Sequence, residues 1–141
     1  MGTWVDGGAI ISSPDGIAWT VRYDSTDGQY QGPRDVVWNG SVFVATVAAN
    51  VMTSTDGATW QTHATGLPWH AFDQIAWDGR QFMGVNFVVA TSPDGIRWTR
   101  QPDSPVHFLQ SIASAGKGEF IAVYSNGVLR TGDDLFTDGW D

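Results

Sequence analysis

The sequence predicts an all-β repeat fold in a single domain. A Ser-x-Asp-Gly-x-x-Trp motif occurs three times, beginning at Ser13, Ser54 and Ser92. The three motif aspartates, and a weaker fourth copy at Asp133, are 41, 38 and 39 residues apart. Self-similarity at a spacing of about 40 residues is typical of repeat architectures. Between the motifs the apolar residues alternate with period two and form no helical stripe, so we expect strands and no helices.

Alignment of the repeats on the motif predicts four short strands in each. The turns between the first and second strands contain Asn39-Gly40 and Asp78-Gly79, strong hairpin signals because both residues of such a turn accept positive φ. A four-stranded meander repeated about every 40 residues is a β-propeller blade. The sequence thus predicts one propeller domain over residues 1–141, with approximate repeats 1–32, 33–70, 71–107 and 108–141.

The repeats at the two ends are incomplete. The first begins inside its second strand, near Thr3, and the last ends in an irregular segment, so the sequence predicts 14 or 15 strands, just short of four blades. An open arc would leave unpaired edges and a half-exposed blade. Three alternatives follow: a small four-bladed ring with one incomplete blade, a larger ring completed by other copies, or a segment of a longer product. The favoured alternative is a homo-oligomer.

The composition restricts the partners. The formal net charge is −8, with seven Lys and Arg residues, so no basic stripe is available for nucleic acid or an anionic membrane. Cysteine is absent, which excludes disulfides and thiolate metal sites. No apolar run approaches the ~20 residues that span a bilayer, and residues 1–6 lack a signal-peptide pattern. We expect a soluble protein, cytoplasmic or virion-associated, without a metal or cofactor, although the compartment stays open.

The motif itself is predicted to be a structural turn. Its Asp carboxylate would accept backbone N–H groups, its Gly would take positive φ, and its Trp would bury apolar area between neighbouring blades. A Ca²⁺ or catalytic site needs several converging carboxylates, whereas here each repeat has one. The residues predicted to build these turns are Ser13, Asp15, Gly16, Trp19, Ser54, Asp56, Gly57, Trp60, Ser92, Asp94, Gly95 and Trp98.

The Ser-Pro-Asp-Gly-Ile-x-Trp segments 13–19 and 92–98 resemble the Asp-box, or bacterial neuraminidase repeat, of sialidase-like β-propellers. The resemblance covers nearly the whole chain and implies a propeller fold. The usual motif is Ser-x-Asp-x-Gly-x-x-Trp; in this chain Gly directly follows Asp, so the turn is one residue shorter. The family includes sialidases, xyloglucanases, photosystem II assembly factors and sorting receptors, so the resemblance specifies the fold more closely than the function. In the family the box lies on the face opposite the active site.

Sialidase activity would require three arginines around the substrate carboxylate, a Tyr–Glu nucleophile pair and an acid Asp. Only Arg34 lies where a first strand begins, and Glu119 is the only glutamate of the chain. The catalytic set is therefore missing, and the sequence predicts a protein that is not an enzyme. A glycosidase with two carboxylates remains a third alternative, although no pair is singled out.

The loops that join the last strand of one repeat to the first strand of the next are predicted to bind ligand. They lie opposite the motif turns and carry aromatic, amide and imidazole groups, which suit a glycan or a peptide; the alternative is that they pack on neighbouring blades. The leading hypothesis is a non-enzymatic binding module for a glycan or protein surface. The second is an assembly component, such as a viral tail or scaffold protein. The candidate ligand-binding residues are Tyr30, Gln31, Arg34, Trp69, His70, Phe72, His107 and Phe108.

Overall fold

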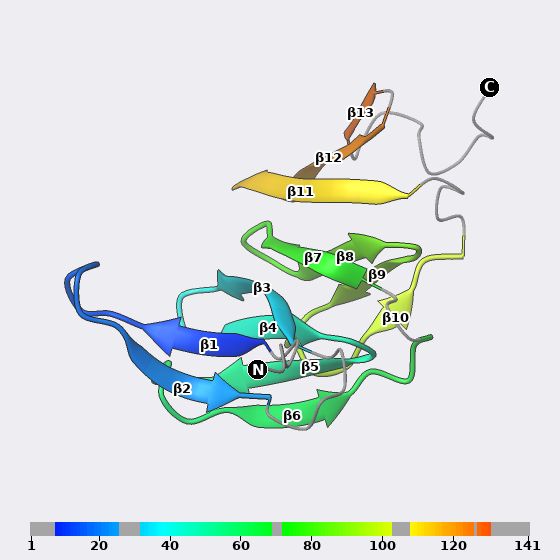
Figure 1. The fold of residues 1–141 in the computed structure, drawn as a ribbon. Coiled ribbons are helices and arrows are strands. Elements are labelled where there is room, and N and C mark those ends of the chain that lie inside the picture. Colours follow the sequence, from blue (N-terminus) through cyan, green and yellow to red (C-terminus); the bar gives the residue numbers. More distant parts are fainter. Residues whose placement is uncertain (1–7, 26–31, 69–71, 103–107, 126, 131–141) are drawn as a thin grey trace, which may run out of the picture.

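The chain folds entirely into β-structure in the computed structural model (Figure 1), which describes residues 8–25, 32–68, 72–102, 108–125 and 127–130. Within these ranges there are thirteen strands and no helix, so the prediction of an all-β protein is confirmed. The strands expected before residue 8 and after residue 130 lie outside the described residues. The described part also holds no helix with the length and apolar character needed to cross a membrane.

The strands form four small antiparallel sheets in which neighbours in sequence are paired. The first sheet contains β1 (Ala9–Ser12) and β2 (Thr20–Asp24). The second contains β3 (Pro33–Trp38), β4 (Phe43–Val47), β5 (Asn50–Ser54) and β6 (Gln61–Ala64). The third contains β7 (Phe72–Trp77), β8 (Phe82–Asn86), β9 (Val89–Ser92) and β10 (Thr99–Arg100). The fourth contains β11 (Leu109–Gly116), β12 (Glu119–Tyr124) and β13 (Gly127–Arg130).

The hairpin turns after β3 and β7 lie where the sequence predicts them but differ in mechanism. Only the glycines have positive φ, 100° at Gly40 and 95° at Gly79. Asn39 and Asp78 instead use their side-chain Oδ1 atoms, which accept from the N–H groups two and three residues further on at 2.7 to 2.9 Å. The expectation of positive φ at both turn residues was therefore wrong, because a side-chain acceptor stabilises the turn in its place.

Each sheet packs face to face on the next sheet in sequence, so the four sheets form a curved stack (Figure 1). Between the first and second sheets lie Ile10, Tyr23, Ala45, Val47, Met52 and Trp60. Between the second and third lie Val44, Val51, Ile75, Phe82, Val88, Ala90 and Trp98. Between the third and fourth lie Ala76, Met83, Val85, Val89, Leu109, Ile112, Phe120 and Ala122.

The central strands are apolar on both faces because a sheet lies on each side of them. On β4, Val44 packs toward the third sheet and its neighbour Ala45 toward the first, and neither is exposed to solvent. Successive side chains of a strand point to opposite faces. Burial of both faces therefore turns the expected alternation into the continuously buried segment Val44–Val47.

The three Ser-x-Asp-Gly-x-x-Trp segments form the same turn. Asp56 Oδ1 accepts from the backbone N–H groups of Ala58 and Thr59, both at 2.8 Å, and from the Ser54 hydroxyl at 3.0 Å. The Ser54 oxygen in turn accepts from Gly57 N at 2.8 Å. These bonds close the turn locally, without help from a neighbouring sheet. The corresponding carboxylates of the other two turns make the same pair of backbone bonds; they are those of Asp15 and Asp94.

The motif tryptophans have different environments. Trp98 is only 9% exposed, and its indole N–H donates to Gly95 O at 3.1 Å. Trp60 is half-buried and packs against the first sheet. Trp19 differs from the expectation of burial because it is 58% exposed. Trp60 and Trp98 each lie against the preceding sheet of the stack, and among the described residues no sheet precedes β1–β2.

We expect the turn at Asp56 to make stability depend on acid pH. Hydrogen bonds from Thr59 N–H, then Ala58 N–H and Ser54, lower the pKa of Asp56 from 3.8 to about 2. Because the folded-state pKa is depressed, the stabilisation is fully present above pH ~4 and is lost as the pH falls toward 2. An NMR titration of the Asp56 carboxyl carbon should show a midpoint near 2. A midpoint at the ordinary value would contradict the prediction, and Asp56→Asn should weaken the acid dependence of the urea midpoint.

Candidate functional site

The first strands of the second, third and fourth sheets each carry a β-bulge near their start. The pairing register shifts between Pro33 and Asp35, between Phe72 and Gln74, and between Leu109 and Ser111. One extra residue is thereby inserted in each strand. Bulges re-aim side chains and are over-represented beside functional sites. The inserted residues occupy equivalent positions in the three repeats and are Arg34, Asp73 and Gln110.

These three side chains line one pocket. Because β7 lies against both β3 and β11, the three bulges, each near the start of its strand, come close together. The pocket has a volume of about 320 Å³ and opens to solvent. Besides the bulge residues it is lined by Gln74, Asn86, Phe108 and Leu109.

Asp73 is the centre of the polar contacts in the pocket. Arg34 Nε lies 3.6 Å from Asp73 Oδ1, and Asn86 Nδ2 donates to Asp73 Oδ2 at 2.9 Å. Asn86 is 3% exposed, and its Oδ1 atom is buried with no hydrogen-bond partner among the described residues. This oxygen is therefore a buried acceptor close to the pocket, of the kind that calls for a structural explanation.

The backbone beneath the pocket is cross-linked between sheets. The buried Thr46 hydroxyl donates to the carbonyl of Asp73 at 3.0 Å and accepts from Asp35 N at 3.2 Å. Asp35 Oδ2 accepts from Ile75 N on β7 at 2.9 Å. These bonds join β3, β4 and β7 directly below the bulges. They restrict the backbone positions from which the polar side chains of the pocket project.

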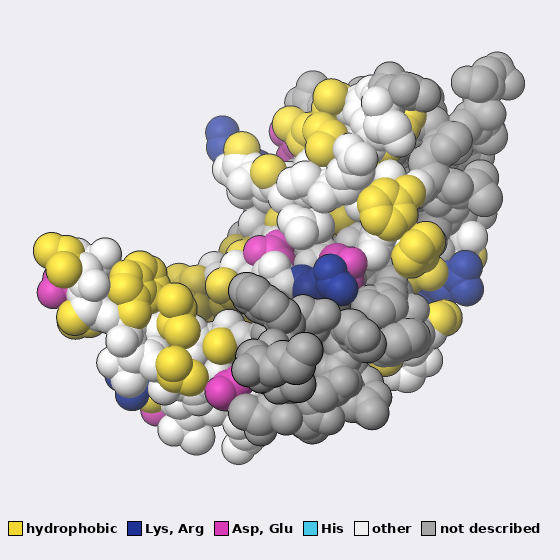
Figure 2. Space-filling view, in the orientation of Figure 1, with side chains coloured by type: hydrophobic (Ala, Val, Ile, Leu, Met, Phe, Trp, Pro, Cys, Tyr) yellow, Lys and Arg dark blue, Asp and Glu magenta, His cyan; other side chains and the backbone are white. Residues whose placement is uncertain are grey.

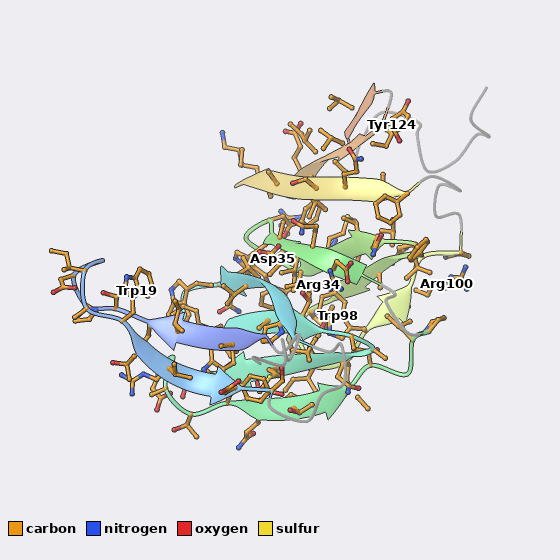
Figure 3. All side chains as sticks on the ribbon, in the orientation of Figure 1. Trp19, Arg34, Asp35, Trp98, Arg100 and Tyr124 are labelled. Atoms are coloured by element: carbon orange, nitrogen blue, oxygen red, sulfur yellow. The ribbon has the colours of Figure 1, made fainter. Side chains whose placement is uncertain are left out.

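Arg34 and Asp73 supply opposite charges to the pocket lining, and the Asp35 carboxylate lies beneath it. In the space-filling view a basic group lies between acidic patches near the middle of the molecule (Figure 2), and the stick view labels Arg34 and Asp35 on β3 (Figure 3). Burial raises the pKa of Asp35, although hydrogen bonds from the N–H groups of Ile75 and Val36 oppose the shift. Arg34 pairs with Asp73. The described lining of the pocket therefore offers hydrogen-bond donors and acceptors side by side.

Two exposed aromatic rings lie at the rim. Phe108 lines the pocket and is 47% exposed, and its ring contacts that of Phe87, which is 64% exposed. The centroids are 5.2 Å apart and the ring planes meet at 73°. An edge-to-face pair fixes the orientation of both rings. Apolar ring surface is thus presented beside hydrogen-bonding groups.

The structure brings together part of the predicted site. Arg34 and Phe108 line the pocket, and Phe72 begins β7, where its backbone pairs with Asn86. The side chain of Phe72 is outside the described part of the chain. The other predicted binding residues also lie outside it; they are Tyr30, Gln31, Trp69, His70 and His107.

Sequence reasoning missed several lining residues. Asp73 and Gln110 align with Arg34 when the repeats are counted back from their first strands, and this equivalence was an available signal. Asn86 ends β8, and Phe87, which contacts Phe108, follows it; nothing local in the sequence connects this segment to the pocket. No protein-family model matches this chain, and comparison with curated proteins finds no significant match. Within the described ranges, no group of three or more His, Asp or Glu residues is arranged to hold a metal ion.

Proposed function

We propose that this chain is a non-enzymatic binding module that recognises a glycan through the pocket at the three bulges. The observation that carries the proposal is the convergence of Arg34, Asp73 and Gln110 on one pocket beside an exposed aromatic pair. Sugars present hydroxyl groups around their edges and apolar C–H surfaces on their faces. Polar side chains with both donors and acceptors, next to an aromatic ring, match both features.

We further infer that the four sheets are blades of a β-propeller of the kind that the sequence predicts. Each is an antiparallel meander of short strands packed on the next sheet in sequence. The first strands β3, β7 and β11 lie next to one another, as the innermost strands of blades do. In such an arrangement the bulges lie at one mouth of the central axis.

A neutral glycan fits the pocket better than an acidic one. The guanidinium of Arg34 is already paired through Nε with the Asp73 carboxylate, which offsets part of the positive charge that an acidic sugar would need. The small volume also favours one or two sugar rings over a protein surface, since a stable protein interface buries roughly 800 Å² on each partner.

The positions of the two nearby carboxylates support binding without hydrolysis. A glycosidase needs one protonated carboxylic acid and one free carboxylate facing the scissile bond. Asp35 has a raised pKa, but its two oxygens accept from the backbone N–H groups of Val36 and Ile75. Asp73 is engaged by Arg34 and Asn86. Both carboxylates are thus occupied by structural contacts.

The proposal is tested with a panel of neutral oligosaccharides by glycan array, followed by calorimetry on the best binder. We expect Phe108→Ala and Asp73→Asn each to weaken binding at least about tenfold, which is about 1.4 kcal/mol. Phe108 is exposed, so its removal should leave the fold intact. Ile96→Ala is the matched control: Ile96 is 38% exposed but lies in a motif turn at the opposite end of the third sheet.

Three results would oppose the proposal. Binding that is insensitive to Phe108→Ala would place the site elsewhere. Tight binding only of acidic sugars would contradict the charge argument. Failure of the whole panel, together with capture of a protein ligand that depends on Phe108, would replace the glycan with a protein surface.

A further inference from the structure

Where two described sheets pack together, each uses the opposite face from the one that its neighbour uses. We call the face toward the preceding sheet the leading face and the face toward the next sheet the following face. In the third sheet, Ala90 and Trp98 on the leading face pack against the second sheet. Met83, Val85 and Val89 on its following face pack against the fourth sheet. In each contact between the described sheets, a leading face therefore meets a following face.

The leading face of the first sheet is exposed. Ile11 stands two residues before its motif serine, as Ala90 does in the third sheet, and Trp19 corresponds to Trp98. Ala90 is fully buried and Trp98 is 9% exposed, whereas Ile11 is 49% and Trp19 58% exposed. Val21, paired with Ile11 across the strands, is 60% exposed. Figure 2 shows hydrophobic side chains along this hairpin, and Figure 3 labels Trp19 there.

The following face of the fourth sheet is exposed in the same way. Val123 and Val128 are cross-strand partners on β12 and β13, as Val85 and Val89 are on β8 and β9. Val85 and Val89 are at most 1% exposed, whereas Val128 is 64% exposed. Ile121, which corresponds to the buried Met83, is 42% exposed. The exposed positions of the fourth sheet are therefore equivalent to the positions through which the third sheet contacts the fourth.

We propose that these two faces bind each other between copies of the chain. The leading face of β1–β2 in one copy packs on the following face of β11–β13 in a second copy. The occupant is a second copy because the two exposed faces continue the series of contacts already made inside the chain, with equivalent residues in equivalent places. Exposed apolar patches of this kind mark interaction surfaces. The contact is head to tail, so it builds a closed ring or a filament and not a symmetric face-to-face dimer.

The test is the solution mass by light scattering behind size exclusion. We expect the wild-type chain to have at least twice the mass of one chain, which is 15.3 kDa. Trp19→Arg and Val128→Arg should each reduce the mass toward that of one chain, because each variant has lost one of the two faces. Ile11→Arg serves as a second leading-face variant if Trp19→Arg fails to fold. Ile96→Arg is the control, since Ile96 is exposed but lies in a motif turn, and it should keep the wild-type mass.

A mixing experiment tests the head-to-tail geometry. Trp19→Arg keeps an intact following face and Val128→Arg an intact leading face. An equimolar mixture should therefore give a species of two chains that cannot grow further. A wild-type monomer, variants that keep the wild-type mass, or a mixture that remains monomeric would each overturn the proposal.

Discussion

Phe82→Ala should lower the free energy of unfolding by about 3–5 kcal/mol, the range for removing a buried aromatic ring. Phe82 is fully buried between the second and third sheets, where its ring centroid lies 4.6 Å from that of Trp77 and 6.5 Å from that of Trp98. Its loss leaves a cavity lined by side chains from two sheets, and rigid strands close such a cavity poorly. Since a domain has only about 5–15 kcal/mol of stability in total, a large fraction would be lost.

The measurement is urea denaturation followed by tryptophan fluorescence, with Phe87→Ala as the matched control. Phe87 is 64% exposed and its main contact is the ring pair with Phe108, so the same change of residue type should alter stability by no more than about 1.5 kcal/mol. Equal effects of the two substitutions would contradict the packing described for the second and third sheets.

Gly95→Ala should have the second large effect, because the added methyl group meets both a strained backbone and a packed core. Gly95 has φ +80°, and a Cβ atom there would lie 2.5 Å from Val44 Cγ2 and 3.3 Å from Phe82 Cε2. Left-handed backbone costs an ordinary residue roughly 1–2 kcal/mol. Overpacking of a filled core adds about 1–3 kcal/mol. The two contributions together approach the effect of Phe82→Ala.

Gly16→Ala separates the two contributions. Gly16 occupies the same motif position with φ +76°, but nothing lies within 4 Å of its added Cβ. Only the backbone cost of roughly 1–2 kcal/mol should appear in urea denaturation. If Gly16→Ala were as damaging as Gly95→Ala, steric contact with the second sheet would not be the cause of the larger effect.

The proposed pocket and the proposed contact between copies use different parts of the molecule. The pocket lies at the starts of β3, β7 and β11, whereas the contact uses the outer faces of the first and last sheets. Trp19→Arg should therefore change the mass and leave affinity for a single sugar unchanged, and Phe108→Ala should do the reverse. Assembly would multiply the number of pockets and so raise the avidity for a repeating glycan.

The local features of this protein were predictable from its sequence. Each Ser-x-Asp-Gly-x-x-Trp turn closes through bonds among neighbours in the chain, so the same residues make the same turn three times. The all-β class follows from short runs of strand-forming residues bounded by turn signals, such as segments 43–47 and 82–86. The positions of the turns at Asn39 and Asp78 were predicted correctly. The side-chain acceptors that stabilise these turns were not predicted.

The features that depend on which sheets are neighbours could not be read from the sequence. Trp19 and Trp98 belong to nearly identical segments, yet one is exposed and the other buried, because burial depends on the sheet that precedes each. The pocket depends on three bulges, and a bulge is a property of the pairing between two strands. The hydrogen bonds within each motif turn involve neighbouring residues and recur in all three of these turns. Packing between sheets and pairing between strands involve residues far apart in the chain. For that reason the repeats have the same turns but different surroundings.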